Sequence, residues 1–207
     1  MRRTKEEAEK TRASILMAAE TLFLEHGVAR TSLEHIARHA GVTRGAVYWH
    51  FENKAHLFHE MLNQVRLPIE QLTEQLCKGF ENNPKLALRD LCIEVMLDLA
   101  VNPQKQRIFT ILLHRCELTE ELQEAMDRHT EFINQFIALC EQYFSQLPIS
   151  EHLQPGITPR LAARTLNALI VGLLSDWLRD PELFDPEQDI RPIFVALFNG
   201  LLKHTDA

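Results

Sequence analysis

The sequence predicts an all-α protein of about nine helices. Its 207 residues include only 7 glycines and 9 prolines, too few for the turns of a many-stranded β protein. Apolar residues recur at steps of three and four, and several prolines follow a residue that can cap a helix. Apolar residues make up 45% of the chain and charged residues 25%, which is typical of a globular protein with a core. We expect no strand and no internal repeat.

Three short helical segments open the chain. The first runs from about Glu7 and ends at Gly27, since glycine adopts the left-handed C-terminal conformation without steric cost. The second covers residues 33–40, after the possible caps Thr31 and Ser32, and the third covers residues 43–50. Two short helices separated by a turn that contains glycine are typical of a helix-turn-helix.

Longer helices are expected downstream. A fourth helix is predicted over residues 54–80, with a kink near Pro68, and a long one over residues 119–146. At four places a capping residue is followed by proline, which predicts a further helix start: Asn83-Pro84, Asn102-Pro103, Thr158-Pro159 and Asp185-Pro186. Residues 147–157 and 180–185 read as loops.

Charge is distributed unevenly along the chain. Residues 1–66 contain 10 Lys and Arg against 8 Asp and Glu, whereas residues 67–207 contain 12 against 21, and the total is −7. A weakly basic N-terminal unit therefore precedes an acidic remainder. The opening MRRTKEEAEKTR does not resemble a signal peptide and no apolar run is long enough to span a membrane, so we expect a cytoplasmic protein without a membrane partner.

No catalytic, metal or cofactor site is expected. The chain lacks HExxH, GxSxG and a glycine-rich phosphate loop, so it is not expected to be an enzyme. The pairs His35 with His39 and His56 with His59 each lack a third metal ligand, and exposed helical histidines are the expectation. The remaining candidates are four widely spaced cysteines, which we expect to be reduced core thiols rather than a redox switch: Cys77, Cys92, Cys116 and Cys140.

The third helix carries an unusual set of outward residues. Val47 and Phe51 are four apart and can face a core, which leaves polar and aromatic side chains outside, a pattern that suits a DNA major groove. There Arg44 can pair with guanine and Gly45 allows a close backbone approach. The outward residues are Thr43, Arg44, Gly45, Tyr48, Trp49 and His50. The alternative is that the aromatic residues pack between helices and that Arg44 is simply solvated.

A family resemblance supports the DNA-binding interpretation. TSLEHIARHAGVTRGAVYWHFENKAHLF, with KTRASILMAAETLFLEHGVAR before it, resembles the DNA-binding domain of the TetR/AcrR family of bacterial regulators. RRTKEEAEKTR and ILLHRCELTEEL resemble the subgroup that represses multidrug efflux operons, and LNQVRLPIEQLTEQL and DWLRDPELFDP extend the similarity to individual members. The resemblance implies a DNA-binding domain over residues 1–53, extending to about 66, and a ligand-binding and dimerisation domain over residues 54–207.

The family assigns DNA contacts residue by residue. The helix-turn-helix covers residues 33–52, from Leu33 to Glu52, and Lys54 falls on the family's phosphate-contacting lysine. The implied DNA-binding residues are Thr31, Ser32, Thr43, Arg44, Gly45, Tyr48, Trp49, His50 and Lys54.

The last two expected helices have wide apolar faces. Family members form homodimers through such helices, which places two recognition helices on a palindromic operator about one DNA turn apart. The implied interface consists of Leu166, Leu169, Ile170, Leu173, Trp177, Ile193, Phe194, Leu197, Phe198 and Leu201. The alternative is that these faces are buried within one subunit.

Between the two ends, apolar residues can line a cavity for a hydrophobic small-molecule effector. The candidates are Met61, Leu62, Met96, Phe109, Leu113, Cys116, Phe132, Phe136 and Trp177, each of which can equally belong to an ordinary core. Nearby acidic residues either favour cationic ligands or form a solvated face, which we prefer: Glu117, Glu120, Glu121, Glu124, Asp127 and Glu131.

The resemblance implies a ligand-responsive repressor of a multidrug efflux operon, released from its operator by a hydrophobic molecule. One alternative is a repressor or activator of a metabolic operon that senses a metabolite. Another is a helical interaction protein that does not bind DNA.

Overall fold

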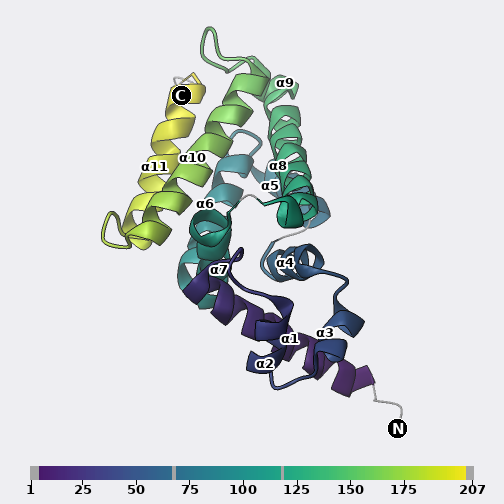
Figure 1. Cartoon of the computed structure of the whole chain (residues 1–207). Helices are drawn as coiled ribbons and strands as arrows, with labels where there is room; N and C mark the ends of the chain where they lie inside the picture. Colours follow the sequence, from purple (N-terminus) through teal and green to yellow (C-terminus); the bar gives the residue numbers. More distant parts are fainter. Residues whose placement is uncertain (1–4, 67–68, 118, 204–207) are drawn as a thin grey trace. The chain divides into compact units, whose positions relative to one another are not determined.

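The computed structural model describes residues 5–66, 69–117 and 119–203 and is built from helices (Figure 1). The α-helices are α1 (Lys5–His26), α2 (Leu33–His39), α3 (Arg44–His50), α4 (Lys54–Asn63), α5 (Ile69–Asn82), α6 (Ala87–Val101), α7 (Pro103–Thr110), α8 (Gln123–Phe144), α9 (Leu147–Ser150), α10 (Pro159–Arg179) and α11 (Pro186–Leu201). A π-helical turn, η1 (Ile111–Arg115), and a 3₁₀ turn, η2 (Glu120–Leu122), lie between α7 and α8. The described residues contain no strand, only an isolated bridge between Leu153 and Leu202, so the all-α prediction is confirmed.

The chain divides into two compact units. The first contains Met1–Arg66 together with Gln104–Thr130, and the second contains Leu67–Pro103 and Glu131–Ala207. The segment Gln104–Thr130 thus packs with the N-terminal unit although it is distant from it in sequence.

The first unit is a helical cluster around α1. Its buried centre includes Phe23 and Phe58, whose rings meet edge to face at 6.1 Å between centroids. Helices α1, α2 and α3 pack together (Figure 1). Gly27 has a φ of +85°, and its N–H donates to the Phe23 carbonyl at 2.9 Å, which ends α1 as the sequence predicts.

Side-chain caps begin the next three helices. The Ser32 hydroxyl accepts from the N–H of His35, the Thr43 hydroxyl from Ala46, and the Asn53 side chain from His56. These bonds satisfy N–H groups that have no partner within the helix. The caps at Ser32 and Thr43 confirm the starts expected from the sequence.

The second unit is centred on α6, which packs against α5 and α11. Tyr143 is buried, and its hydroxyl donates to the Pro84 carbonyl at 2.7 Å. The ring of Phe144 lies 6.0 Å from that of Phe198 on α11. Apolar packing therefore joins the end of α8 to α11, and the Tyr143 hydroxyl joins the end of α8 to the segment before α6.

Several expected element bounds are wrong. The single helix expected over residues 54–80 is instead α4 and α5, and the kink expected at Pro68 lies outside the described residues. The start expected at Asn83-Pro84 is displaced, because α6 begins at Ala87 without a side-chain cap. The stretch 147–157, expected to be a loop, contains α9. The starts at Pro103, Pro159 and Pro186 are confirmed.

The cysteines are less uniform than expected. Cys92 and Cys140 are buried, and burial raises the pKa of the Cys140 thiol to about 12. Cys116 is half-buried with a pKa raised to about 11, mainly by burial. Cys77 is exposed on α5, so the prediction that it is a core thiol is wrong.

One helix, α10, is long and apolar enough to cross a membrane, although the sequence pattern predicts no spanning segment. The criterion uses length and composition alone, and 22% of the apolar window is buried within the protein. A single such helix does not by itself indicate a membrane protein.

Candidate nucleic-acid interface

Helix α3 presents one face to the core and the other to solvent. Val47 is fully buried, and Phe51, which caps the C-terminus of α3, is 1% exposed. On the other face Tyr48 is 46% exposed and Trp49 is 72% exposed. The inward and outward positions are those that the sequence predicts, and two aromatic side chains remain available to a partner.

Arg44 is pre-positioned on the exposed face. Its guanidinium donates to the Tyr48 hydroxyl at 3.3 Å and lies 5.3 Å from the centre of the Tyr48 ring. The hydrogen bond to Tyr48 raises the pKa of Arg44. The cation is therefore held on the outer side of α3, where a bidentate contact with a guanine edge is sterically open.

Gly45 leaves the helix backbone accessible. A methyl group at this position would meet only the Thr43 hydroxyl, at 3.9 Å. Trp49 stands beside His50, with ring centroids 4.5 Å apart and planes almost perpendicular. The backbone of α3 is therefore accessible at Gly45, near its N-terminus, and the aromatic residues stand at its C-terminal end.

Two expected DNA contacts are placed inside the protein. Thr31 is 1% exposed, and its hydroxyl donates to the Gly27 carbonyl at 2.9 Å. Lys54 is 4% exposed, and its ammonium donates to backbone carbonyls and pairs with Glu121. Both side chains serve the fold of the loop between α1 and α2, whereas Ser32 is exposed at the start of α2.

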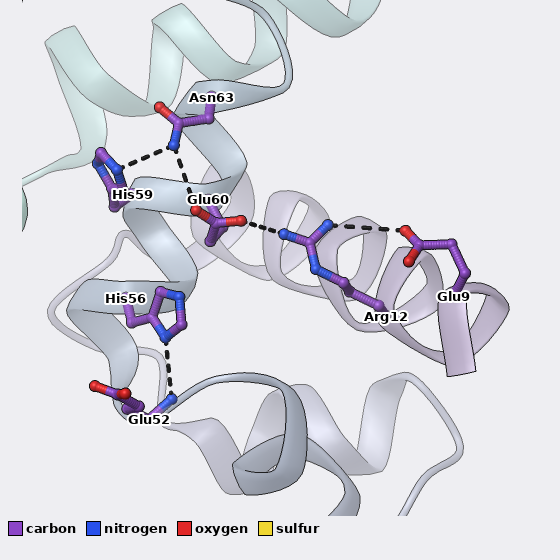
Figure 2. Close-up of polar contacts among 7 residues, drawn as sticks. All are labelled: Glu9, Arg12, Glu52, His56, His59, Glu60 and Asn63. Carbon is purple, nitrogen blue, oxygen red and sulfur yellow. Dashed lines mark hydrogen bonds and ion pairs between the residues drawn. The ribbon is translucent and has the colours of Figure 1, made fainter. Parts of the chain in front are cut away.

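Arg12, which the sequence pattern does not single out, joins α1 to the end of α3 and to α4. Its guanidinium pairs with Glu60 on α4 and with Glu9 at 3.9 Å (Figure 2). It also lies 5.5 Å from the centre of the Phe51 ring. Arg12 and Glu60 are 48 residues apart, so no local spacing could have identified the pair.

The histidines of α4 are used in hydrogen bonds. His56 accepts from the Glu52 N–H through Nδ1 at 3.2 Å, and Asn63 contacts His59 at 3.0 Å and Glu60 at 3.3 Å (Figure 2). Partial burial, and next the Arg128 charge, lower the pKa of His59, which favours its neutral form. Among the described residues, no group of three or more His, Cys, Asp or Glu is arranged to hold a metal ion.

An open pocket of about 730 Å³ lies in the first unit, and none of the predicted ligand residues lines it. It is formed by the end of α1, the following loop, α2 and the end of η1. Its lining consists of Leu22, Glu25, His26, Arg30, His35, Arg38, His39 and Arg115. The three arginines make its walls net positive.

The predicted effector residues are divided between the two units. In the first unit Met61 and Leu62 belong to the buried core, with Phe109 and Cys116 packed against it, and Leu113 is half-buried. In the second unit Met96 is buried, and Phe132, Phe136 and Trp177 are half-buried. The acidic residues named with them are exposed, which agrees with a solvated face.

The predicted dimer residues include some that point inward. Leu166 on α10 is buried within the second unit, and so are Phe194, Phe198 and Leu201 on α11. Helix α11 packs on α6 of the same chain. The other six residues of the predicted interface are half-buried: Leu169, Ile170, Leu173, Trp177, Ile193 and Leu197. Leu161 and Val171 on α10, which are not in the predicted interface set, are exposed by 47% and 39%. Exposed apolar side chains therefore remain on α10.

Family models match both the N-terminal and the C-terminal part of the chain. The family model described as "Bacterial regulatory proteins, tetR family" matches residues 15–61, and the model "MAATS-type transcriptional repressor, C-terminal region" matches residues 83–203. The HTH-type transcriptional repressor BepR of Brucella suis is 37% identical over 188 residues, which are 89% of this chain and 88% of BepR.

Two solved structures are similar over almost the whole chain. The first is NalD, the secondary repressor of the MexAB-OprM multidrug efflux pump in Pseudomonas aeruginosa. It has a TM-score of 0.92 and 58% identity, covering 97% of this chain and 100% of that one. A complex of SmeT with triclosan has a TM-score of 0.72 and 30% identity, covering 90% of each chain.

Proposed function

Because the chain belongs to the TetR family of bacterial regulatory proteins, we propose that it represses a multidrug efflux operon and leaves its operator when a hydrophobic molecule binds. The observation that carries the proposal is the exposed face of α3, where Arg44, Tyr48 and Trp49 project from a buried scaffold. The 58% identity to NalD supports the efflux operon as the target. A cytoplasmic location follows from this role.

The DNA contact is proposed to be made by the α3 face together with Ser32. Arg44 reads a guanine, the open backbone at Gly45 allows close approach, and the side chains of Thr43, Tyr48, Trp49 and His50 bind phosphate oxygens and set the register. With its small positive charge, one such unit binds weakly, so two copies must act on a palindromic site. The exposed apolar side chains of α10 are proposed to join them.

The effector is proposed to be apolar. The second unit supplies Met96, Phe132, Phe136 and Trp177 as candidate contacts, and aromatic and thioether groups accommodate varied apolar ligands. SmeT, which is 30% identical, forms a complex with triclosan, which makes triclosan a suitable first probe. A ligand that favours the conformation with poor DNA affinity lowers operator occupancy by a coupling of about 1 to 3 kcal/mol.

The test is selection of operator sequences from a random DNA library by the full-length protein. We expect a palindrome bound by two chains, as measured by sedimentation, with weaker binding when triclosan is added. Arg44→Ala should cost about 1 to 3 kcal/mol of operator binding and relax base preference at one position of each half-site. Failure to enrich any sequence would contradict the proposal, and enrichment without a triclosan effect would restrict it to DNA binding.

A further inference from the structure

The Lys54 ammonium is buried with a complete set of protein acceptors. It donates to the Val28 carbonyl at 3.1 Å and the Thr31 carbonyl at 3.2 Å, and it lies 2.7 Å from a carboxylate oxygen of Glu121. An ammonium has three N–H donors, and these three acceptors can use all of them. In this arrangement no donor remains for a DNA phosphate.

The acceptors come from two separated segments of the first unit. Val28 and Thr31 belong to the loop between α1 and α2, which ends at the cap residue Ser32. Glu121 belongs to η2, and the nearby turn η1 contributes a second link, because the Arg115 carbonyl accepts the Val28 N–H at 3.0 Å. The loop that leads into α2 is therefore held by the Lys54 ammonium, which Glu121 pairs with, and by the Arg115 carbonyl.

We propose that Lys54 and Glu121 are positioning residues for DNA binding. Lys54 holds the α1–α2 loop in the conformation that places Ser32 and α2 correctly, and Glu121 keeps the buried ammonium in place. A negatively charged residue thus supports binding to a polyanion. The inference rests on the function proposed above.

Electrostatics alone predicts the opposite effect of Glu121. Removing a carboxylate from a DNA-binding unit reduces repulsion and should strengthen binding to phosphates. If Glu121 holds Lys54, its removal instead leaves a buried ammonium without its counter-charge, which is strongly unfavourable. Lys54 then turns outward and releases the Val28 and Thr31 carbonyls. The sign of the change in operator affinity separates the two effects.

The experiment compares Glu121→Gln with Glu120→Gln in the full-length protein. The two variants remove the same charge from adjacent exposed residues of η2, but only Glu121 pairs with Lys54. The probe is the duplex selected by the wild-type protein, and a random duplex measures non-specific binding. We expect Glu121→Gln to weaken operator binding by roughly tenfold or more and to lower the ratio of specific to random binding. Glu120→Gln should bind as tightly as wild type or slightly more tightly.

Lys54→Met provides an independent measurement. Each phosphate contact contributes about 0.9 to the slope of log K against log salt concentration, so loss of a contact lowers that slope by about this amount. We expect an unchanged slope with a weaker affinity; a slope lowered by about 0.9 would identify Lys54 as a phosphate contact and overturn the inference.

Four outcomes are distinguishable. Glu121→Gln binding that equals or exceeds that of Glu120→Gln overturns the inference and leaves the proposed function intact, since wild type still binds the duplex. Glu121→Gln can also lower the fraction of protein that binds DNA while the ratio of operator to random-duplex affinity is unchanged. Glu121 then only stabilises the fold, and the inference is overturned. If Lys54→Met does not fold, the Glu121→Gln comparison decides alone. Absence of any duplex selected by wild type would contradict the proposed function itself.

Discussion

Residues of α3 and its C-cap fall into a buried set that packs in the core and an exposed set that is proposed to contact DNA. Val47 and Phe51 are buried, whereas the guanidinium of Arg44 donates to the hydroxyl of its exposed neighbour Tyr48. Because that contact is formed on the protein surface, exchanging it for the proposed contact with a guanine edge exposes no buried group. For that proposed contact, an arginine whose movement is already restricted lowers the entropy cost of binding.

Gly45 should show opposite effects on stability and affinity. In Gly45→Ala the added methyl group meets no protein atom closer than 3.9 Å, so the fold accommodates it. Alanine is favoured over glycine in helices, and the free energy of unfolding in urea should rise by up to about 1 kcal/mol. The same methyl group stands between α3 and the groove, and operator affinity should fall by roughly tenfold. A variant that binds the operator as tightly as wild type would show that DNA does not approach α3 at this position.

At the scale of secondary-structure elements, the start of α2 depends on the turn that ends α1. Gly27 has a φ of +85°, and a methyl group there would meet the Arg115 carbonyl at 3.5 Å. The neighbouring Val28 N–H donates to that same carbonyl at 3.0 Å. The α1–α2 turn and η1 therefore form one structure.

Gly27→Ala should destabilise the protein by about 1 to 2 kcal/mol, since alanine is strained at positive φ. The control is Gly45→Ala on α3, where the added methyl group meets no protein atom closer than 3.9 Å and φ is not in the positive range. That variant should be neutral or more stable by up to about 1 kcal/mol. Equal urea-unfolding midpoints for the two variants would contradict the importance of the left-handed turn.

At the scale of the whole molecule, net charge does not describe the DNA-binding part. The chain carries −7, but residues 1–66 have two more basic than acidic side chains. The segment 104–130, which packs with them, contains 4 basic and 5 acidic residues and leaves the unit weakly positive. Such a unit gains little from bulk electrostatics and depends on specific contacts.

Stability should decrease in mild acid because of His129. Burial, followed by the neighbouring Arg66 charge, lowers the pKa of His129 from 6.5 to about 4. Between these pH values the unfolded chain binds a proton that the folded chain does not, so the contribution is complete above about pH 6.5 and is lost as the pH falls towards 4.

We expect the free energy of unfolding in urea to be lower at pH 5 than at pH 7, with His129 contributing on the order of 1 kcal/mol after allowance for its partial exposure. His129→Gln should remove that part of the pH dependence. The exposed His39, replaced in the same way, serves as the control. An identical pH dependence in wild type and His129→Gln would contradict the assignment.

The local sequence determined the first three helices, the caps of α2 and α3 and the exposed face of α3, because these follow from neighbouring residues. The spacing of Val47 and Phe51, the caps Ser32 and Thr43, and the left-handed Gly27 act within one turn or one helix. The TetR family signature is of the same kind, since it lies in a continuous stretch of the chain.

Tertiary structure alone decided which polar groups are available. Thr31 and Lys54 look like DNA contacts in the sequence, but carbonyls of the α1–α2 loop and the distant Glu121 use their donors. Likewise, α11 turns Phe194 and Phe198 inward because α6 covers them. Partners separated by tens of residues leave no periodic trace in the sequence, whereas burial and hydrogen bonding depend on where those partners lie in space.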